Sequence, residues 1–198
     1  MSAPPPVALQ RGLVTRAKAI LLQPRTEWHV IDTEPSTIGS IYTGYVLPLA
    51  AIPAICGAVW LFRFTPGLAL RYAITTYVLA LVSVYVLALI IDALAPSFGA
   101  QKNLLQAFKV AAYSYTASWV AGVFLLLPAL GILALIGSLY SLYLFFVGLP
   151  ILMKVAADRA TSYAIVCIIA AIVVAVVIGY IAGAVGGLGG VYGAGFYR

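Results

Sequence analysis

The chain has 198 residues, of which 64% are hydrophobic and 8% charged, and its mean hydropathy is +1.11. This composition excludes an ordinary water-soluble domain and indicates a protein embedded in a lipid bilayer. The net charge of +6 comes from basic residues beside the edges of apolar blocks, where anionic lipid headgroups are the nearest acidic partner. We therefore expect contacts with lipid and none with nucleic acid.

Residues 1–35 are expected to form a cytoplasmic segment before the membrane domain, without the apolar core of a cleavable signal peptide. Between residues 7 and 23, apolar side chains share one arc of a helix and basic side chains flank it, which predicts an amphipathic helix. Such a helix either lies on an anionic leaflet or packs on the cytoplasmic surface of the protein's own bundle. Glu27, Asp32 and Glu34 are interpreted as solvated or helix-capping charges. The residues assigned to the membrane surface are Arg11, Arg16, Lys18, Arg25 and Trp28.

Residues 36–198 are predicted to form one all-α membrane bundle of five transmembrane helices. Each apolar block approaches or exceeds the roughly 20 residues that a helix needs to cross a bilayer, and open strands cannot satisfy their backbone groups in lipid. Only Pro128 separates the third block from the fourth, so it marks either a tight turn or a kink. The predicted spans are residues 37–62, 72–95, 106–127, 129–152 and 161–186.

The distribution of basic residues predicts the orientation, because cytoplasmic loops are rich in Lys and Arg. An odd number of spans then places the N-terminus in the cytoplasm and the C-terminus outside the inner membrane. One side carries Arg11, Arg16, Lys18, Arg25, Lys102, Lys109, Lys154 and Arg159, and the other carries Arg63, Arg71 and Arg198.

Three patterned stretches follow one another around the apolar blocks. They are LLQPRTEWHVIDTE (Leu21–Glu34), IDALAPSFGAQKNLLQAFKVAAYSYTASW (Ile91–Trp119) and YSLYLFFVGLPILMKVAADRATSYAI (Tyr140–Ile165). Together they resemble bacterial members of the Yip family, named in eukaryotes as Ypt/Rab-interacting proteins. The resemblance implies five spans and a cytosolic N-terminus, but the eukaryotic Rab partnership is not carried over to a bacterial chain. Ala117 departs from the proline expected before the Trp, which leaves the bend of the third span open.

Asp92 is the only acid inside an apolar block, and ionisable residues in membrane spans are rare. Lys102 and Lys109 are its nearest candidate partners in sequence. A turn at Pro96 and Gly99 would fold Lys102 back towards the carboxylate. We expect a salt bridge or helix-end cap, with an ion or proton site and a contact for a partner protein as alternatives.

Three further groups of residues stand out by their type and position. Tyr113, Tyr115, Tyr140 and Tyr143 are either packing material or the lining of a polar seam. Gly148 and Pro150 predict a kink late in the fourth span. Small residues spaced four apart predict close packing against another helix of the bundle or a second subunit. These are Ala171, Ala175, Gly179, Gly183 and Gly187.

No enzyme is predicted, because His29 is the only histidine and no nucleophile motif or Cys-x-x-Cys is present. We expect no catalytic, cofactor-binding or metal residues. The favoured function is a non-catalytic membrane-organising protein or scaffold, possessing unidentified protein partners or forming a homo-oligomer. The alternative is a small transporter, channel or lipid-translocating protein that uses a polar seam around Asp92.

Overall fold

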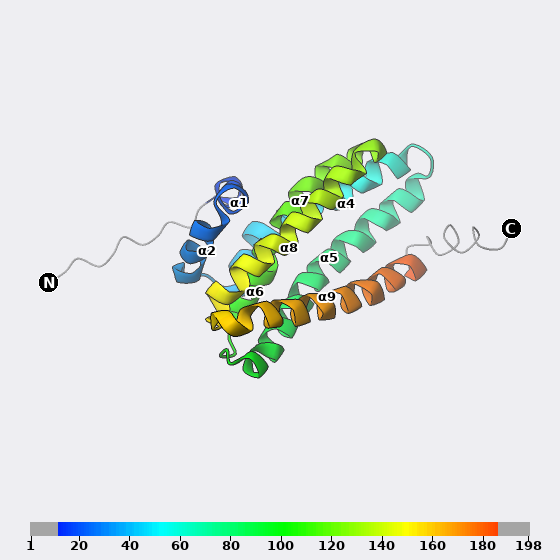
Figure 1. Ribbon diagram of the computed structural model, residues 1–198. Helices are drawn as coiled ribbons and strands as arrows, with labels where there is room; N and C mark the ends of the chain where they lie inside the picture. The colour runs from blue at the N-terminus through cyan, green and yellow to red at the C-terminus, as the bar shows by residue number, and fades with distance from the viewer. Residues whose placement is uncertain (1–11, 186–198) are drawn as a thin grey trace.

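The computed structural model describes residues 12–185, which form helices joined by short connections and contain no strand (Figure 1). Two short helices lie first, α1 (Leu13–Leu22) and α2 (Pro24–Thr33). The remaining α-helices are α3 (Ile38–Ile41), α4 (Leu47–Phe62), α5 (Pro66–Leu94), α6 (Leu104–Ser114), α7 (Thr116–Ala121), α8 (Gly131–Met153) and α9 (Ala157–Val185). The tighter 3₁₀ turns are Ala95–Phe98, Gly122–Leu126 and Pro128–Leu130, and Tyr42–Val46 is a π-helical turn between α3 and α4.

Four of these helical stretches are long and apolar enough to cross a membrane, which confirms the membrane class. Their outward side chains are largely apolar, including Ile74 at 56% and Ile136 at 56% exposure, an arrangement that suits lipid and is costly in water. The four stretches are Ile38–Phe62, Pro66–Phe98, Gly131–Met153 and Ala157–Val177.

The third predicted span is not one continuous helix, so the structure differs here from the five regular helices expected. The chain breaks between α6 and α7 at Tyr115 and tightens into a 3₁₀ turn after Ala121. The Thr116 hydroxyl donates to the Tyr113 carbonyl at 2.6 Å and lies 2.7 Å from the Tyr45 hydroxyl. Side-chain bonding of this kind competes with the helical backbone ladder, and it bends the segment without a proline.

The chain reverses direction at Pro128–Leu130, so this proline marks a turn rather than a kink. The α7 and α8 helices pair along the segments that flank the turn. The Ser141 hydroxyl accepts from the Ser118 amide at 2.8 Å, and the Ser118 and Ser138 hydroxyls lie 3.2 Å apart. This close approach needs glycine, because a Cβ on Gly137 would lie 2.9 Å from the Ala117 carbonyl oxygen.

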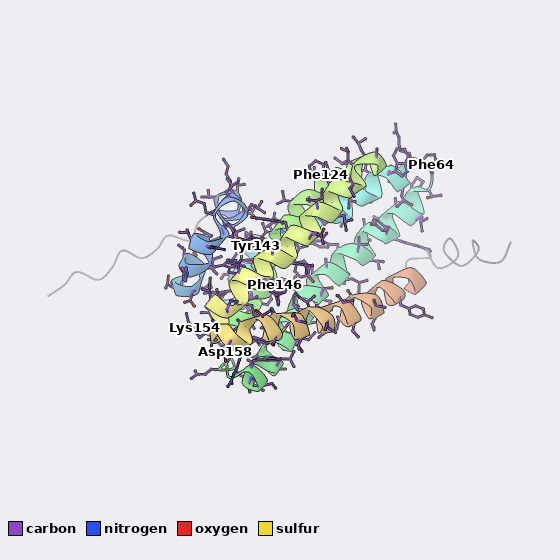
Figure 2. All side chains as sticks on the ribbon, viewed as in Figure 1. Phe64, Phe124, Tyr143, Phe146, Lys154 and Asp158 are labelled. Atoms are coloured by element: carbon purple, nitrogen blue, oxygen red, sulfur yellow. The ribbon has the colours of Figure 1, made fainter. Side chains whose placement is uncertain are left out.

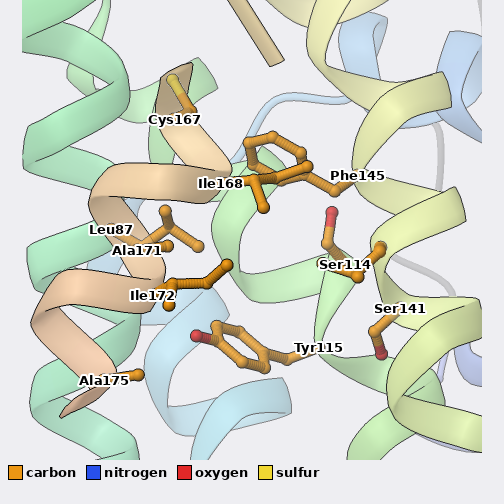
Figure 3. A pocket seen from close by; sticks show the side chains of 11 residues that line it. Leu87, Ser114, Tyr115, Ser141, Phe145, Cys167, Ile168, Ala171, Ile172 and Ala175 are labelled. Atoms are coloured by element: carbon orange, nitrogen blue, oxygen red, sulfur yellow. The ribbon is translucent and has the colours of Figure 1, made fainter. Parts of the chain in front are cut away.

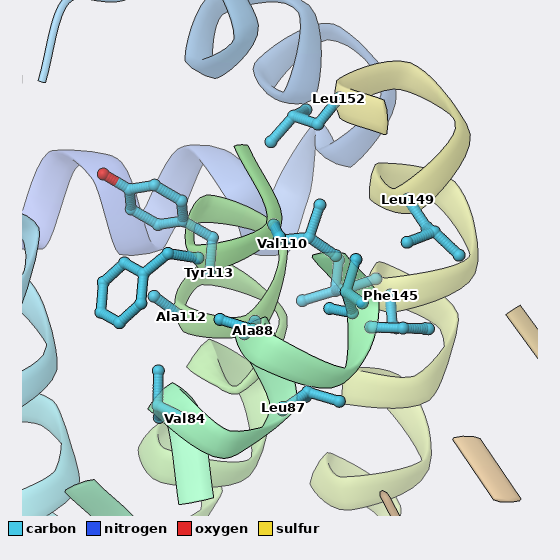
Figure 4. Close-up of a cluster of buried hydrophobic side chains, with 14 of the residues drawn as sticks. Val84, Leu87, Ala88, Val110, Ala112, Tyr113, Phe145, Leu149 and Leu152 are labelled. Atoms are coloured by element: carbon cyan, nitrogen blue, oxygen red, sulfur yellow. The ribbon is translucent and has the colours of Figure 1, made fainter. Parts of the chain in front are cut away.

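The main hydrophobic core lies towards the end of the bundle at which α8 finishes (Figure 4). It combines side chains from α5, α6 and α8, and Ile20, Trp28 and Ile31 of the first two helices belong to the same cluster. In Figure 2, Lys154 and Asp158 mark this end, and Phe64 and Phe124 mark the opposite end. The N-terminal helices therefore share the core of the bundle.

The small-residue face of α9, predicted to pack against another helix of the bundle or a second subunit, is only partly covered within residues 12–185. Tyr163, Ala164 and Cys167 are buried in the first half of the helix, which contacts α5 and α8. Ala171 is half-buried, whereas Ala175 and Gly179 are exposed, and no atom lies within 4 Å of a Cβ built on Gly179. The surroundings of Gly183, and Gly187 altogether, fall outside the described part of the chain.

Candidate functional site

A pair of ion pairs joins the two N-terminal helices inside the protein. Arg16 of α1 is 2% exposed, and its guanidinium donates to the carboxylates of Glu27 and Glu34, which are 3% and 8% exposed. Removing charges from water is costly unless each one is paired and hydrogen-bonded. These ion pairs therefore hold α1 against α2 and against the C-terminal end of α2.

Lys109 of α6 attaches the end of α2 to the membrane bundle. Its ammonium, also buried, donates to the carbonyls of Ile31 and Glu34, both at 2.8 Å. The last carbonyls of a helix have no intrahelical donor, and a cation there also complements the negative end of the helix dipole. Lys109 thus serves as a C-terminal cap supplied by another helix.

Trp28 is fully buried between α2 and the bundle. Its ring meets Tyr113 edge-on with a centroid distance of 6.4 Å, and the Arg16 guanidinium lies 5.8 Å from the Tyr113 ring centroid. A Cβ on Gly148 would lie 2.4 Å from the indole ring. The absence of a side chain at Gly148 therefore leaves the space that the Trp28 ring occupies. The α8 helix continues through Pro150 to Met153.

Contacts around the edge complete the attachment. The Tyr140 hydroxyl donates to the Leu21 carbonyl in the last turn of α1 at 2.8 Å. Asp32 pairs with Lys154 at the end of α8 and accepts from the Gln106 amide at 3.3 Å. We call the set Arg16, Glu27, Trp28, Glu34, Lys109, Tyr113 and Gly148 the docking cluster.

This arrangement corrects the assignment of Arg16 and Trp28 to the membrane surface. The first helix was predicted to lie either on an anionic leaflet or on the protein's own bundle, and the described residues pack on the bundle. Lys18 and Arg25 remain exposed, and Arg11 lies outside the described residues. The sequence does contain an indication that this segment packs on the protein: residues 12–35 have three basic and three acidic residues, so their net charge is zero. A strongly positive balance would favour an anionic leaflet instead.

The expected salt bridge between Asp92 and Lys102 is not formed. Asp92 is half-buried in α5, and its Oδ1 is buried without a hydrogen-bond partner. Lys102 is exposed in the connection before α6. The nearby Tyr163 hydroxyl donates to the Ile91 carbonyl. The turn at Gly99 does form, but its left-handed backbone does not bring Lys102 back to the carboxylate.

The four predicted tyrosines divide between two environments. Tyr113 and Tyr140 belong to the attachment of the N-terminal helices. Tyr115 stacks on Trp119 at 5.5 Å, and Tyr143 is 40% exposed with its ring 5.4 Å from that of Tyr140. The structure therefore brings Lys109, Tyr113 and Tyr140 together, but around α1 and α2 rather than around Asp92.

Tyr115 also lines an apolar pocket of about 190 Å³ between α5, the α6–α7 break, α8 and α9 (Figure 3). Its other walls include Leu87, Phe145 and Ile172. Ser114 lines it too, 4% exposed and with a hydroxyl that has no hydrogen-bond partner. The lining suits a hydrocarbon chain. Among residues 12–185, no group of three His, Cys, Asp or Glu side chains is placed to hold a metal ion.

Comparison with known proteins adds a family relationship. A model of the Yip1 domain matches residues 18–178, a range that begins inside α1 and includes all of α2. Inner membrane protein YohC of Escherichia coli K12 is 28% identical over 158 residues, covering 71% of this chain and 80% of the relative. YohC of E. coli O6:H1 matches to the same extent. No solved structure matches the chain.

Replacing Arg16 by Met should destabilise the protein by about 3–5 kcal/mol, because the buried Glu34 carboxylate loses the cation that compensates it. Thermal unfolding in detergent measures the loss. Tryptic cleavage at the exposed Lys18 and Arg25 should also accelerate as α1 and α2 detach. Lys18→Met, an exposed change two residues away, is the matched control. Equal stability of the two variants would contradict a structural role for the ion pairs.

Replacing Gly148 by Ala should cost roughly 1–3 kcal/mol, because the new methyl group overlaps the Trp28 ring. Differential scanning fluorimetry and the tryptophan emission maximum report the loss of stability and the displacement of the indole. Gly179→Ala makes the same change on α9, where no atom lies within 4 Å, and should be neutral or slightly stabilising. If the two variants have the same thermal stability and emission maximum, the Trp28 ring does not depend on the space beside Gly148.

Proposed function

The chain belongs to the Yip1 domain family of integral membrane proteins, and from this premise we propose that it is a non-catalytic organiser of the bacterial inner membrane. In this proposal it crosses the bilayer five times, with the N-terminus in the cytoplasm and the C-terminus outside. It holds lipids or other membrane proteins in place and carries out no reaction on them.

Five crossings are supported by the direction of α8. This helix ends at Lys154, whose ammonium pairs with Asp32 of α2, so it brings the chain back to the end at which the N-terminal helices lie. The segment before it must therefore have carried the chain to the opposite end. That segment is the broken stretch from Leu104 to Leu126, whose last turn packs on α4 with Gly122 against Pro53.

The observation that carries the scaffold proposal is the use of the buried polar side chains. The buried side chains of Arg16, Glu34 and Lys109 each form bonds that hold the first two helices. The half-buried Tyr140 hydroxyl also donates to the first helix. A transport pathway needs polar groups that remain available to a moving substrate. The structure also contains a polar pocket beside Gln106, which shares no lining residue with the apolar pocket beside Ser114. The two pockets therefore do not form one continuous path, and this favours a structural role for the buried polar side chains.

A second candidate is a small transporter or lipid-translocating protein. Two observations favour it: the buried Asp92 Oδ1 has no partner, and the apolar pocket at Ser114 lies beside exposed residues such as Ile172. An unpaired carboxylate in a membrane span is costly to maintain, which is why such groups commonly serve ion or proton movement.

Reporter fusions test the topology. A fusion after Lys154 should report the cytoplasm and one after Arg198 the periplasm, because α9 is the last crossing. Paired reporters, one active on each side of the membrane, control for expression. A cytoplasmic signal from the fusion after Arg198 would leave an even number of crossings and overturn the five-span proposal.

Reconstitution into liposomes separates the two functions. A scaffold should show no proton flux and no movement of labelled lipid between leaflets above the level of protein-free vesicles, and Asp92→Asn should behave like the wild type. In cells, single-particle tracking should find it in assemblies that diffuse more slowly than an unrelated five-span protein. Flux that disappears in Asp92→Asn would refute the scaffold and establish transport.

A further inference from the structure

A polar groove lies beside the docking cluster, at the end of the bundle where α8 finishes. It has a volume of about 350 Å³ and is bounded by residues 99–103, the first turn of α6 and the end of α8. Leu152 and Met153 are its apolar wall. Its polar wall includes Lys102, Asn103, Gln106 and Lys154. None of the residues of the docking cluster lines the groove.

The groove carries an excess of one positive charge. Two lysines line it, and the Lys154 ammonium already pairs with Asp32. Lys102 is exposed and takes part in none of the ion pairs formed within residues 12–185. On the neighbouring wall, the Arg159 guanidinium lies 2.9 Å from the position of a Cβ on Gly99, and Asp158 is 3.8 Å from that guanidinium. The unmatched charge suits one monoanion.

Gln106 forms part of the polar wall of the groove. Its amide nitrogen donates to the carbonyl and to the carboxylate of Asp32, both at 3.3 Å. This contact orients Asp32, whose carboxylate pairs with the Lys154 ammonium at the edge of the groove. Gln106 therefore helps to hold Lys154 in place beside Lys102.

The position of the groove decides which monoanion it meets. It lies where the apolar span of α8 ends at Met153 and the first charged residue, Lys154, follows in a left-handed conformation with φ of 54°. Given the proposed membrane placement, this is the level of the phospholipid headgroups.

We propose that the groove binds the headgroup of a bilayer phospholipid. Its phosphodiester lies against Lys102 and Lys154. The proposal deepens the organising function and rests on it, because it names a lipid partner for the cytoplasmic end of the bundle. It also places lipid recognition on the second-to-third connection rather than on α1.

The test measures lipid binding to the full chain in detergent by native mass spectrometry. Titration with phosphatidylglycerol should give a saturable bound lipid, and Lys102→Gln should weaken it about fivefold, as expected for one lysine at an anionic surface. Arg71→Gln, another exposed basic change at the far end of α5, is the control and should leave the affinity unchanged. Equal affinity in Lys102→Gln and the wild type would refute the site.

Two further titrations identify the ligand. Phosphatidylmethanol has the same charge as phosphatidylglycerol but no hydroxyl donor in its headgroup, so it should bind about equally well if the lysines recognise the phosphodiester. Loss of binding with phosphatidylmethanol would contradict recognition by charge. Soluble glycerol phosphate should not displace the lipid at matched concentration, and displacement would mean a site for free phosphate esters. The flux assay in liposomes tests the organising function, and the lipid titration tests the groove. The two proposals can therefore fail independently of one another.

Discussion

The pairing of Arg16 with Glu27 and Glu34 is the interaction on which the N-terminal architecture depends. All three side chains are almost fully removed from water, so separating any of them leaves a buried charge that costs several kcal/mol. The pairing holds α1 against α2 and presents Trp28 and the end of α2 to the bundle. Lys109 then caps the carbonyls of Ile31 and Glu34 from α6. Residues 12–35 are thereby joined to the membrane bundle through its own core.

This attachment explains why the polarity of the bundle lies where it does. Tyr113 and Tyr140 contact the N-terminal helices, and Gly148 is small because the Trp28 indole occupies the adjacent space. The third segment breaks at Tyr115, where the Thr116 hydroxyl bonds to the backbone and to Tyr45. A regular helix would forgo those bonds. Most of the buried polar side chains among residues 12–185 thus contact other parts of the fold, and the groove at Lys102 and Gln106 lies outside this set of contacts.

Much of the fold follows from hydropathy, but the site does not. The apolar spans predicted at residues 37–62, 72–95, 129–152 and 161–186 correspond to four long apolar helical stretches, which begin at Ile38, Pro66, Gly131 and Ala157. They are predictable because only a helix or a closed barrel satisfies the backbone in lipid. The expected partner of Asp92 was wrong because sequence proximity suggested Lys102, whereas that side chain faces a groove. Similarly, four-residue spacing in α9 identifies a face of small residues but not what meets it. Within the described part of the chain, no other element comes within 4 Å of a Cβ built on Gly179.

By itself, the sequence determined that this is an all-helical membrane protein, because the length and composition of apolar blocks are local properties. Its resemblance to the Yip family lay in three patterned stretches of the chain. The sequence also contained the balanced charges of residues 12–35. Only the tertiary structure decided that these charges pair with one another inside the protein, that Lys109 caps α2 from 75 residues away and that Gly148 receives Trp28. The physical reason is that burial and pairing join residues far apart in the chain, and local periodicity carries no information about such contacts.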